Sequence, residues 1–166
     1  APGLLLRASE APPARTLVDV LTETAARHPD ASALEDAAGA LSYRELLAQV
    51  FAGAARLRER GVGRGDRVGV RMSSGTRELY VAILSVLAAG AAYVAVDADD
   101  PEERAELVFG EAAVRAVLTD AGLAVGDAPA VPVFDGSAPH PSTAAVPVVS
   151  PPEPEDDAWI IFTSGS

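Results

Sequence analysis

Residues 76–96, TRELYVAILSVLAAGAAYVAV, contain a helix pattern that passes directly into a strand pattern. Apolar residues recur at helical spacing in the first part of this segment, which predicts a helix over residues 76–89. These apolar residues are Leu79, Ile83, Val86 and Leu87. Gly90 stands at the position where a glycine commonly ends a helix. Residues 92–96 then form a short apolar run with the length and composition of a buried strand.

A capping box predicts a second helix upstream. Ser42 is followed three residues later by Glu45, so each side chain can bond to the backbone N–H of the other residue. The apolar face of this helix comprises Leu46, Leu47, Val50, Ala54 and Leu57. Three glycines within residues 61–65 end the helix and lead into a strand predicted near residues 67–71.

The N-terminal region contains signals for a further helix and a hairpin. Thr16 is a suitable N-cap, and Pro29 closes the segment that follows it. We expect the apolar face of this helix to consist of Leu17, Val20, Leu21 and Ala25. Residues 32–36 and 40–41 flank a turn that contains a glycine, which predicts a short hairpin.

The alternation of helix and strand continues after residue 96. Pro101 fits the first turn of a helix that extends to about Glu111, and residues 114–118 predict another strand. Helices that alternate with short apolar strands are typical of an α/β fold, a layered structure with a largely parallel sheet and flanking helices. Ligands of such sheets bind beyond the carboxyl ends of the strands.

The composition changes after residue 127. A proline-rich connection spans residues 128–157, with a short strand candidate at residues 131–134. A final apolar strand is predicted at residues 158–162, and we expect Phe162 to pack inward on it.

Thr163, Ser164, Gly165 and Ser166 follow that strand directly. Glycine lets a chain approach an anion closely, and successive backbone N–H groups can hold a phosphate. Because these residues follow a strand, we expect them at the carboxyl edge of the sheet, where ligands bind. The pattern indicates a phosphate-binding loop, and the same residue types are also common in simple turns.

The composition argues against several classes of partner. The 166 residues include 24 acidic side chains and 13 basic ones, all arginine, which gives a net charge of −11. Nucleic acids and anionic membranes bind basic surfaces, so neither is an expected partner. The sequence has no cysteine and no apolar run of membrane-spanning length, which suggests a soluble, cytoplasmic protein.

Three other kinds of site receive little support. Residues 61–65, GVGRG, follow a helix and precede a strand, whereas a dinucleotide-binding loop needs the reverse order. A serine hydrolase needs a G-x-S-x-G elbow, which the C-terminal residues do not supply. Two distant histidines without cysteine provide no metal-ligand spacing, so no metal ligand is assigned.

Three segments match ordered core motifs of one enzyme family. Residues 41–46, LSYREL, match L-T/S-Y-x-E-L. Residues 87–97, LAAGAAYVAVD, resemble L-K-A-G-x-A-Y-V-P-I-D, with Ala88 in place of lysine and Ala95 in place of proline, and residues 101–104, PEER, match the P-x-x-R that follows. Residues 162–166, FTSGS, resemble the start of Y-T-S-G-S-T-G-x-P-K-G, with Phe162 in place of tyrosine. The chain thus resembles a nonribosomal peptide synthetase adenylation domain, of the acyl-adenylate-forming, AMP-binding superfamily.

The resemblance implies a fold, a site and a reaction. The fold would be the opening part of the large N-terminal subdomain of an adenylation domain. Thr163, Ser164, Gly165 and Ser166 would form part of the ATP phosphate loop, and no catalytic residue is expected in this chain. An amino acid or other carboxylate would react with Mg-ATP to give an acyl-adenylate. The acyl group would then pass to the phosphopantetheine thiol of a carrier protein.

Other motif positions have expected structural roles. Tyr43 and Tyr93 would be core aromatics, Gly90 would stop a helix, and Asp97 would anchor a loop. An MbtH-like activator protein is a candidate partner, and the alanine-rich helix end near residues 88–92 is a candidate contact surface for it.

The expected organisation is a lead-in segment at residues 1–15 and the N-terminal portion of an adenylation domain at residues 16–166. We expect the rest of that domain to be absent and the chain to be inactive by itself. Two alternatives stay open: an acyl- or aryl-CoA ligase of the same superfamily, or a non-catalytic interaction fragment.

Overall fold

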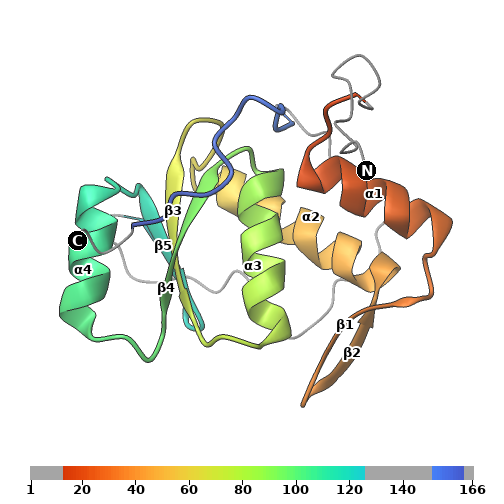
Figure 1. The fold of residues 1–166 in the computed structure, drawn as a ribbon, viewed down its shortest axis with the longest axis horizontal. Helices are drawn as coiled ribbons and strands as arrows, with labels where there is room; N and C mark the ends of the chain where they lie inside the picture. The colour runs from red at the N-terminus through yellow and green to blue at the C-terminus, as the bar shows by residue number, and fades with distance from the viewer. Residues whose placement is uncertain (1–12, 126–150, 163–166) are drawn as a thin grey trace, which may run out of the picture.

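A four-stranded sheet lies at the centre of the computed structural model, which describes residues 13–125 and 151–162 (Figure 1). The strands are β3 (Arg67–Met72), β4 (Ala92–Asp97), β5 (Ala116–Thr119) and β6 (Gly122–Val125), in the spatial order β4-β3-β5-β6. β3 pairs in parallel with β4 and with β5, whereas β6 pairs antiparallel with β5. The prediction of a largely parallel sheet is confirmed.

Helices cover both faces of this sheet, as Figure 1 shows. α3 (Arg77–Ala88) joins β3 to β4, and α4 (Glu102–Glu111) joins β4 to β5. These two connections cross the sheet in opposite directions, so right-handed crossovers place α3 and α4 on opposite faces. α2 (Tyr43–Glu59) packs against α3, and α1 (Leu17–Arg27) packs against both. The predicted layered α/β architecture is therefore confirmed.

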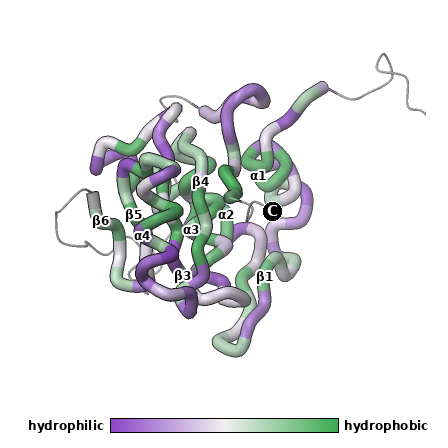
Figure 2. Tube along the Cα trace, turned by 60° about the vertical axis from the view of Figure 1, so that its left-hand side comes forward, coloured by the Kyte–Doolittle hydropathy of each residue, from purple (hydrophilic) through white to green (hydrophobic). Residues whose placement is uncertain are grey.

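Each face of the sheet has its own hydrophobic core. The larger core lies between the sheet and the helices α2 and α3, and its innermost side chains include Val50, Leu57, Val70, Val86 and Leu118. The smaller core lies under α4 and contains Val94, Val96, Ala105, Phe109 and Ala112. Figure 2 shows hydrophobic residues along the central strands and their covering helices, with hydrophilic residues in the connecting loops. Full burial of one such aliphatic side chain stabilises a fold by about 1.5–3 kcal/mol.

α1 begins with a capping box that the sequence analysis identified only in part. Thr16 is the N-cap as predicted, and it exchanges hydrogen bonds with Asp19. The predicted apolar face is partly wrong, because Leu17 and Val20 are exposed. Val18, Leu21 and Ala25 form the buried face instead. Two apolar stripes share this helix, and packing against α2 and α3 selects one of them.

α2 and the hairpin before it agree with the sequence analysis. The predicted capping box is present, with Ser42 Oγ accepting the N–H of Glu45 at 3.3 Å and Glu45 Oε2 accepting the N–H of Ser42 at 2.8 Å. The predicted apolar face is buried or half-buried along its whole length. β1 (Ser32–Asp36) and β2 (Gly39–Ser42) form the predicted antiparallel hairpin.

α3 and α4 end in the same hydrogen-bonding pattern, a Schellman motif. In α3 the N–H of Gly90 bonds to Leu87 O at 2.9 Å, and the N–H of Ala91 bonds to Val86 O at 3.1 Å. The residue in the left-handed conformation is Gly90 in α3, with φ +88°, and Ala113 in α4, with φ +50°. Gly90 is thus the predicted helix stop, and Ala113 holds a conformation that strains a residue with a Cβ.

The sequence analysis missed β6, and three of its predictions need correction or lie outside the described residues. Pro101 is the N-cap of α4 and not a residue of its first turn. Residues 158–162 form one isolated β-bridge within the described residues and not a continuous strand. The strand candidate at residues 131–134 lies outside the described residues.

Candidate functional site

The segment that precedes the predicted phosphate loop runs parallel to β4. Trp159 forms a parallel bridge with Tyr93. The N–H of Tyr93 bonds to Ala158 O at 3.0 Å, and the N–H of Ile160 bonds to Tyr93 O at 3.1 Å. The rings of Tyr93 and Trp159 also stack, with centroids 6.0 Å apart and planes 8° from parallel. Residues 158–160 are therefore fixed to the outer edge of β4.

Side chains alternate on either side of this segment as they do in a strand. Ile160 and Phe162 pack against the smaller core beneath α4. Trp159 and Ile161 point outward and are 56% and 62% exposed. The expectation that Phe162 packs inward is confirmed, because its partly buried ring contacts the core cluster around Val94 and Phe109.

The parallel direction brings the end of this segment to the carboxyl edge of the sheet. There it borders a cavity of about 220 Å³ between the end of β4, α4 and residues 160–162. The lining includes Val96, Asp97, Asp100, Arg104 and Phe162. Thr163 follows Phe162 directly, but Thr163, Ser164, Gly165 and Ser166 lie outside the described residues.

Carboxylates at this edge are engaged by nearby hydrogen-bond donors. Asp97 Oδ1 accepts the N–H of Asp99 at 2.9 Å. This bond, followed by a side-chain hydrogen bond from Ser74, holds the pKa of Asp97 below its ordinary value. Asp97 thus connects the loop after β4 to the loop after β3, which agrees with its expected role as a loop anchor.

The arginines at this edge are engaged as well. Arg71 forms an ion pair with Glu102 and donates to Asp100 O at 3.0 Å. Arg104 Nε lies 3.2 Å from Asp100 Oδ2. Both cations therefore hold the β4–α4 loop together. Residues 163–166 carry hydroxyl and backbone N–H groups of the chemical type that binds phosphate.

A second set of contacts fixes the same segment at the opposite, amino edge of the sheet. Arg64 Nε donates to Asp156 Oδ1 at 2.9 Å, and Arg64 Nη2 donates to Glu153 Oε2 at 2.6 Å. Asp156 Oδ2 accepts the N–H of Glu153 at 2.9 Å, so the two acids belong to one closed turn. We call Arg64, Glu153 and Asp156 the Arg64 clamp.

The clamp shifts the pKa values of Arg64 and Asp156. The pKa of Arg64 is raised, first by the hydrogen bond to Glu153 and then by the bond to Asp156. The pKa of Asp156 is lowered, first by the backbone N–H of Glu153 and then by the Arg64 side chain. Both shifts favour the charged forms that make the contact.

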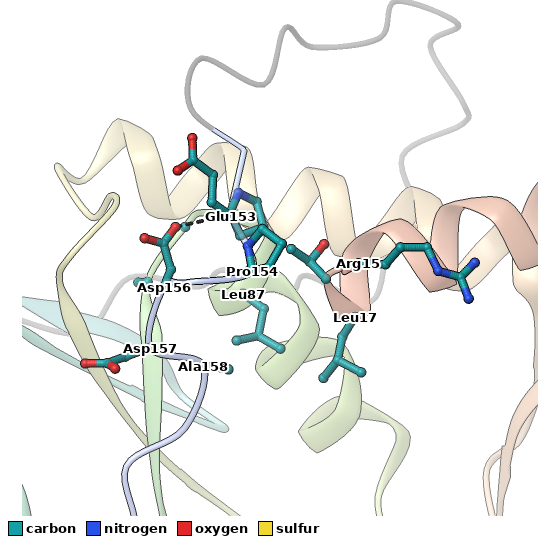
Figure 3. Close-up of a pocket in the computed structure, with 12 residues that line it drawn as sticks. Arg15, Leu17, Leu87, Glu153, Pro154, Asp156, Asp157 and Ala158 are labelled. Atoms are coloured by element: carbon teal, nitrogen blue, oxygen red, sulfur yellow. Dashed lines mark hydrogen bonds between the residues drawn. The ribbon is translucent and has the colours of Figure 1, made fainter. Parts of the chain in front are cut away.

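The turn that carries the clamp also borders a cavity of about 180 Å³ between α1, the end of α3 and residues 152–158. Figure 3 shows Glu153 and Asp156 on one side of this turn, with Leu17 and Leu87 approaching from the two helices. This cavity lies at the amino edge of β4, away from the edge where ligands of parallel sheets bind. Its position favours a packing role for the segment and not a ligand site.

Other expected roles have mixed outcomes. Tyr43 and Tyr93 are half-buried and pack against the larger core, so they lie at its margin and not at its centre. Residues 88–92 are buried, each alanine among them being 3% exposed or less. The helix end near residues 88–92 therefore does not present the exposed contact surface that was suggested for a partner protein.

The sequence analysis missed both contacts that fix residues 153–160. Arg64 and its acidic partners are about 90 residues apart along the chain, and no local pattern connects them. The stack of Tyr93 on Trp159 could be found only once the two strands were known to be neighbours.

Two further findings concern other classes of site. Among residues 13–125 and 151–162, no three His, Cys, Asp or Glu side chains are grouped so as to hold a metal ion. None of the helices in the described part of the chain is both long and apolar enough to cross a membrane.

Comparison with known proteins places the chain in a family. The model of the family described as AMP-binding enzyme matches residues 21–166. Phenyloxazoline synthase MbtB of Mycolicibacterium paratuberculosis is 38% identical over 160 residues, covering 94% of this chain and 13% of the relative. Enterobactin synthase component F of Escherichia coli is 36% identical over 156 residues, covering 93% of this chain and 12% of the relative. The chain thus spans only 12–13% of the length of these curated relatives.

Solved structures agree with this assignment. The nonribosomal peptide synthetase FmoA3 superposes with a TM-score of 0.76 at 35% identity, covering 93% of this chain and 17% of that chain. The N-terminal subdomain of NpsA from Klebsiella oxytoca, in complex with 3-hydroxyanthranilyl-AMSN, superposes with a TM-score of 0.73 at 28% identity, covering 92% and 38%. This chain therefore belongs to the family of AMP-binding enzymes and represents an N-terminal part of a nonribosomal peptide synthetase adenylation domain.

Proposed function

We propose that the protein containing this chain activates an amino acid with ATP. The carboxylate of the amino acid attacks the α-phosphate, giving an aminoacyl-adenylate and pyrophosphate. The phosphopantetheine thiol of a carrier protein then attacks the acyl carbon, which forms a thioester and releases AMP and the thiol proton. Family membership and the two synthetase relatives support this proposal.

The observation that carries the proposal is the parallel bridge between Tyr93 and Trp159. It directs the segment toward the carboxyl edge of the sheet, where α/β proteins bind their ligands. Thr163, Ser164 and Ser166 would donate hydroxyl hydrogen bonds to the ATP phosphates there. Gly165 would let the backbone approach them closely.

The chain's own residues have a limited part in this reaction. The phosphate loop binds and orients ATP, while Phe162 anchors the loop by packing on the smaller core. Mg²⁺ accompanies ATP as a substrate complex and offsets phosphate charge, which this acidic chain, of net charge −11, does little to neutralise. An MbtH-like protein stays a candidate partner, and the cytoplasm stays the expected compartment.

The test is a double substitution in the intact synthetase that contains this chain. Thr163→Ala with Ser164→Ala removes two hydrogen bonds to charged phosphate, each worth about 1.5–3 kcal/mol. Amino-acid-dependent pyrophosphate exchange should then fall by about a hundredfold or more. Thermal unfolding without ATP should hardly change, because both cores of the described residues are built from side chains upstream of residue 163.

The matched control is Thr22→Ala with Thr24→Ala. Both hydroxyls bond to carbonyls within α1, at 2.8 Å and 2.7 Å, and lie outside the proposed phosphate loop. Pyrophosphate exchange should be unaffected in this control. Unchanged exchange in the folded loop variant would remove the phosphate-loop assignment.

A second measurement identifies the acceptor of the acyl group. Transfer of radiolabelled amino acid to a phosphopantetheinylated carrier protein is compared with transfer to free coenzyme A. Transfer to the carrier protein supports the proposal. Preferential transfer to coenzyme A would identify an acyl- or aryl-CoA ligase of the same superfamily instead.

A further inference from the structure

We propose that Arg64 is a positioning residue for the phosphate loop, acting through Glu153 and Asp156 at the opposite edge of the sheet. This inference rests on the proposed function, because it assigns a role to the residues that hold the loop in place. The clamp, the Tyr93–Trp159 stack and the inward packing of Phe162 fix successive points of one short segment.

The ladder hydrogen bonds specify the register of this segment only weakly. Within residues 151–162, the backbone bonds to β4 are the two made by Tyr93. Residues 160–162 then continue to the carboxyl edge and make no further ladder hydrogen bond to another described residue. A slip by one residue would move the segment by about 3.3 Å and reverse which side chains face the core. The inward packing of Ile160 and Phe162 opposes such a slip, and the Arg64 clamp adds a second restraint at the other end of the segment.

Arg64 is suited to fix the register because its own backbone is firmly held. The N–H of Gly63 bonds to Asp66 Oδ2 at 2.8 Å, and Asp66 O accepts the N–H of Ala92 at 2.9 Å. The backbone of Arg64 also packs so closely on Gly90 that a Cβ there would lie 3.3 Å from Arg64 Cα. The guanidinium thus projects from a loop that is tied to the start of β4.

The acidic partners are equally well organised. The N–H of Asp156 bonds to Glu153 O at 3.0 Å, and the Asp156 carboxylate bonds back to the N–H of Glu153. This closed turn presents two carboxylates to one guanidinium, whose planar fork binds both at a defined geometry. A one-residue slip at Trp159 would have to displace both carboxylates from Arg64.

The exposure of the clamp indicates that it positions the segment and adds little to the stability of the whole fold. The side chains of Arg64, Glu153 and Asp156 are 40%, 57% and 21% exposed. Ion pairs at this exposure add little to global stability, because solvent screens them. They still restrict where a short, weakly paired segment can lie. Loss of the clamp should therefore affect the segment and its loop more than the unfolding of the whole protein.

Hydrogen exchange tests the structural half of this proposal. In the intact synthetase, Arg64→Ala should make peptides that contain Tyr93 or Ile160 exchange at least about tenfold faster, because the amide hydrogen bonds of these two residues join the segment to β4. Asp156→Asn, which leaves the Arg64 loop unaltered, should do the same to a smaller degree. The matched control is Arg44→Ala, which removes an exposed 2.9 Å ion pair with Asp30. Both residues of this pair are far along the chain from residues 153–160.

Kinetics test the functional half. Arg64→Ala should raise the KM for ATP about tenfold in pyrophosphate exchange, with the KM for the amino acid unchanged. Arg64→Lys, which keeps the charge but loses the fork, should give an intermediate KM for ATP. The unfolding temperature of Arg64→Ala should match that of the Arg44→Ala control.

Each remaining outcome overturns the proposal. Unchanged exchange at Tyr93 and Ile160 means that the clamp does not set the register. Faster exchange with an unchanged KM for ATP means that the register does not matter to the loop. An equal rise in both KM values means a general structural defect. Failure of the phosphate-loop assignment is recognised separately, by full activity in the Thr163→Ala, Ser164→Ala variant.

Discussion

The ring of Phe109 in α4 lies directly over Gly69 of β3, in the space that a side chain at position 69 would need. A Cβ built on Gly69 would lie 2.8 Å from Phe109 Cε1, which is closer than real Cβ contacts come. Glycine inside a strand is usually unfavourable, and here it permits α4 to approach the sheet. The two residues together set the spacing between helix and sheet on this face.

Gly69→Ala should destabilise the fold by about 1–3 kcal/mol, because either the ring or the strand must move. The measurement is the free energy of unfolding in urea. Gly63→Ala is the control, since its Cβ would meet nothing within 4 Å, and its cost should stay within about 0.5 kcal/mol. Equal losses at the two positions would show that the Phe109 contact is not the cause.

Ala113→Gly should stabilise the fold by about 0.5–1 kcal/mol. Ala113 adopts φ +50°, a conformation that costs a residue with a Cβ about 1–2 kcal/mol. Glycine removes that strain, but its greater conformational entropy in the unfolded state lowers stability by about 0.4–1 kcal/mol. The reverse change at the equivalent position of α3, Gly90→Ala, should destabilise by more than about 1 kcal/mol. Thermal or urea unfolding of the two variants checks that Ala113→Gly raises the stability and that Gly90→Ala lowers it.

The stability of the fold should fall in acid. The pKa values of Asp19, Glu45, Asp97 and Asp156 are lowered, in each case chiefly by a backbone N–H that bonds to the carboxylate. A lowered pKa means that the group binds protons less readily in the folded state than in the unfolded state. Its stabilisation is therefore complete above the ordinary values of 3.8 for Asp and 4.5 for Glu, and is lost as the pH falls below them.

Urea unfolding between pH 7 and pH 2.5 measures this dependence. The contribution of these groups to the free energy of unfolding should be nearly constant above about pH 5.5 and should decline below about pH 4.5. Ser42→Ala removes the hydroxyl that donates to Glu45 and keeps the backbone N–H that lowers the pKa of Glu45 most, so the decline should be slightly shallower in that variant. A decline of the same size in both proteins would contradict the contribution of the Ser42 hydroxyl.

The stacked rings of Tyr93 and Trp159 should show a measurable coupling. A double-mutant cycle with Tyr93→Ala and Trp159→Ala should give an interaction free energy of about 0.5–1.5 kcal/mol in urea unfolding. The matching cycle of Tyr80→Ala with Trp159→Ala should give a value near zero, because no ring contact joins that pair among the described residues. Coupling of the same size in both cycles would mean that the stack contributes nothing specific.

Local signals predicted most of the helices and strands. The capping box at Ser42 and the terminal glycine at Gly90 act within a few residues, so the sequence pattern and the physical cause coincide. The same holds for the alternation of helix and strand that predicted the parallel sheet. The prediction of the inward face of α1 was partly wrong, because Leu17 and Val18 are both apolar and only packing distinguishes them.

Long-range contacts could not be predicted in this way. β6 is a different case, because it follows β5 through a short local turn that contains the turn residues Asp120 and Gly122, a signal that was overlooked. The Arg64 clamp joins two regions that each look like an ordinary solvated turn. The phosphate-loop residues were predicted from composition and family motifs, and that assignment stays a prediction.

The long separation between β4 and Trp159 has a consequence for synthesis on the ribosome. β4 ends at Asp97, so about 60 more residues must be added before Trp159 is present, which takes roughly 3–12 s at about 5–20 residues per second. Throughout that interval the outer edge of β4 lacks the segment that later covers it, and an open edge can pair with other chains. Nascent chains of this protein therefore pass through a stage in which Tyr93 and its neighbours depend on chaperones or low local concentration for protection from aggregation.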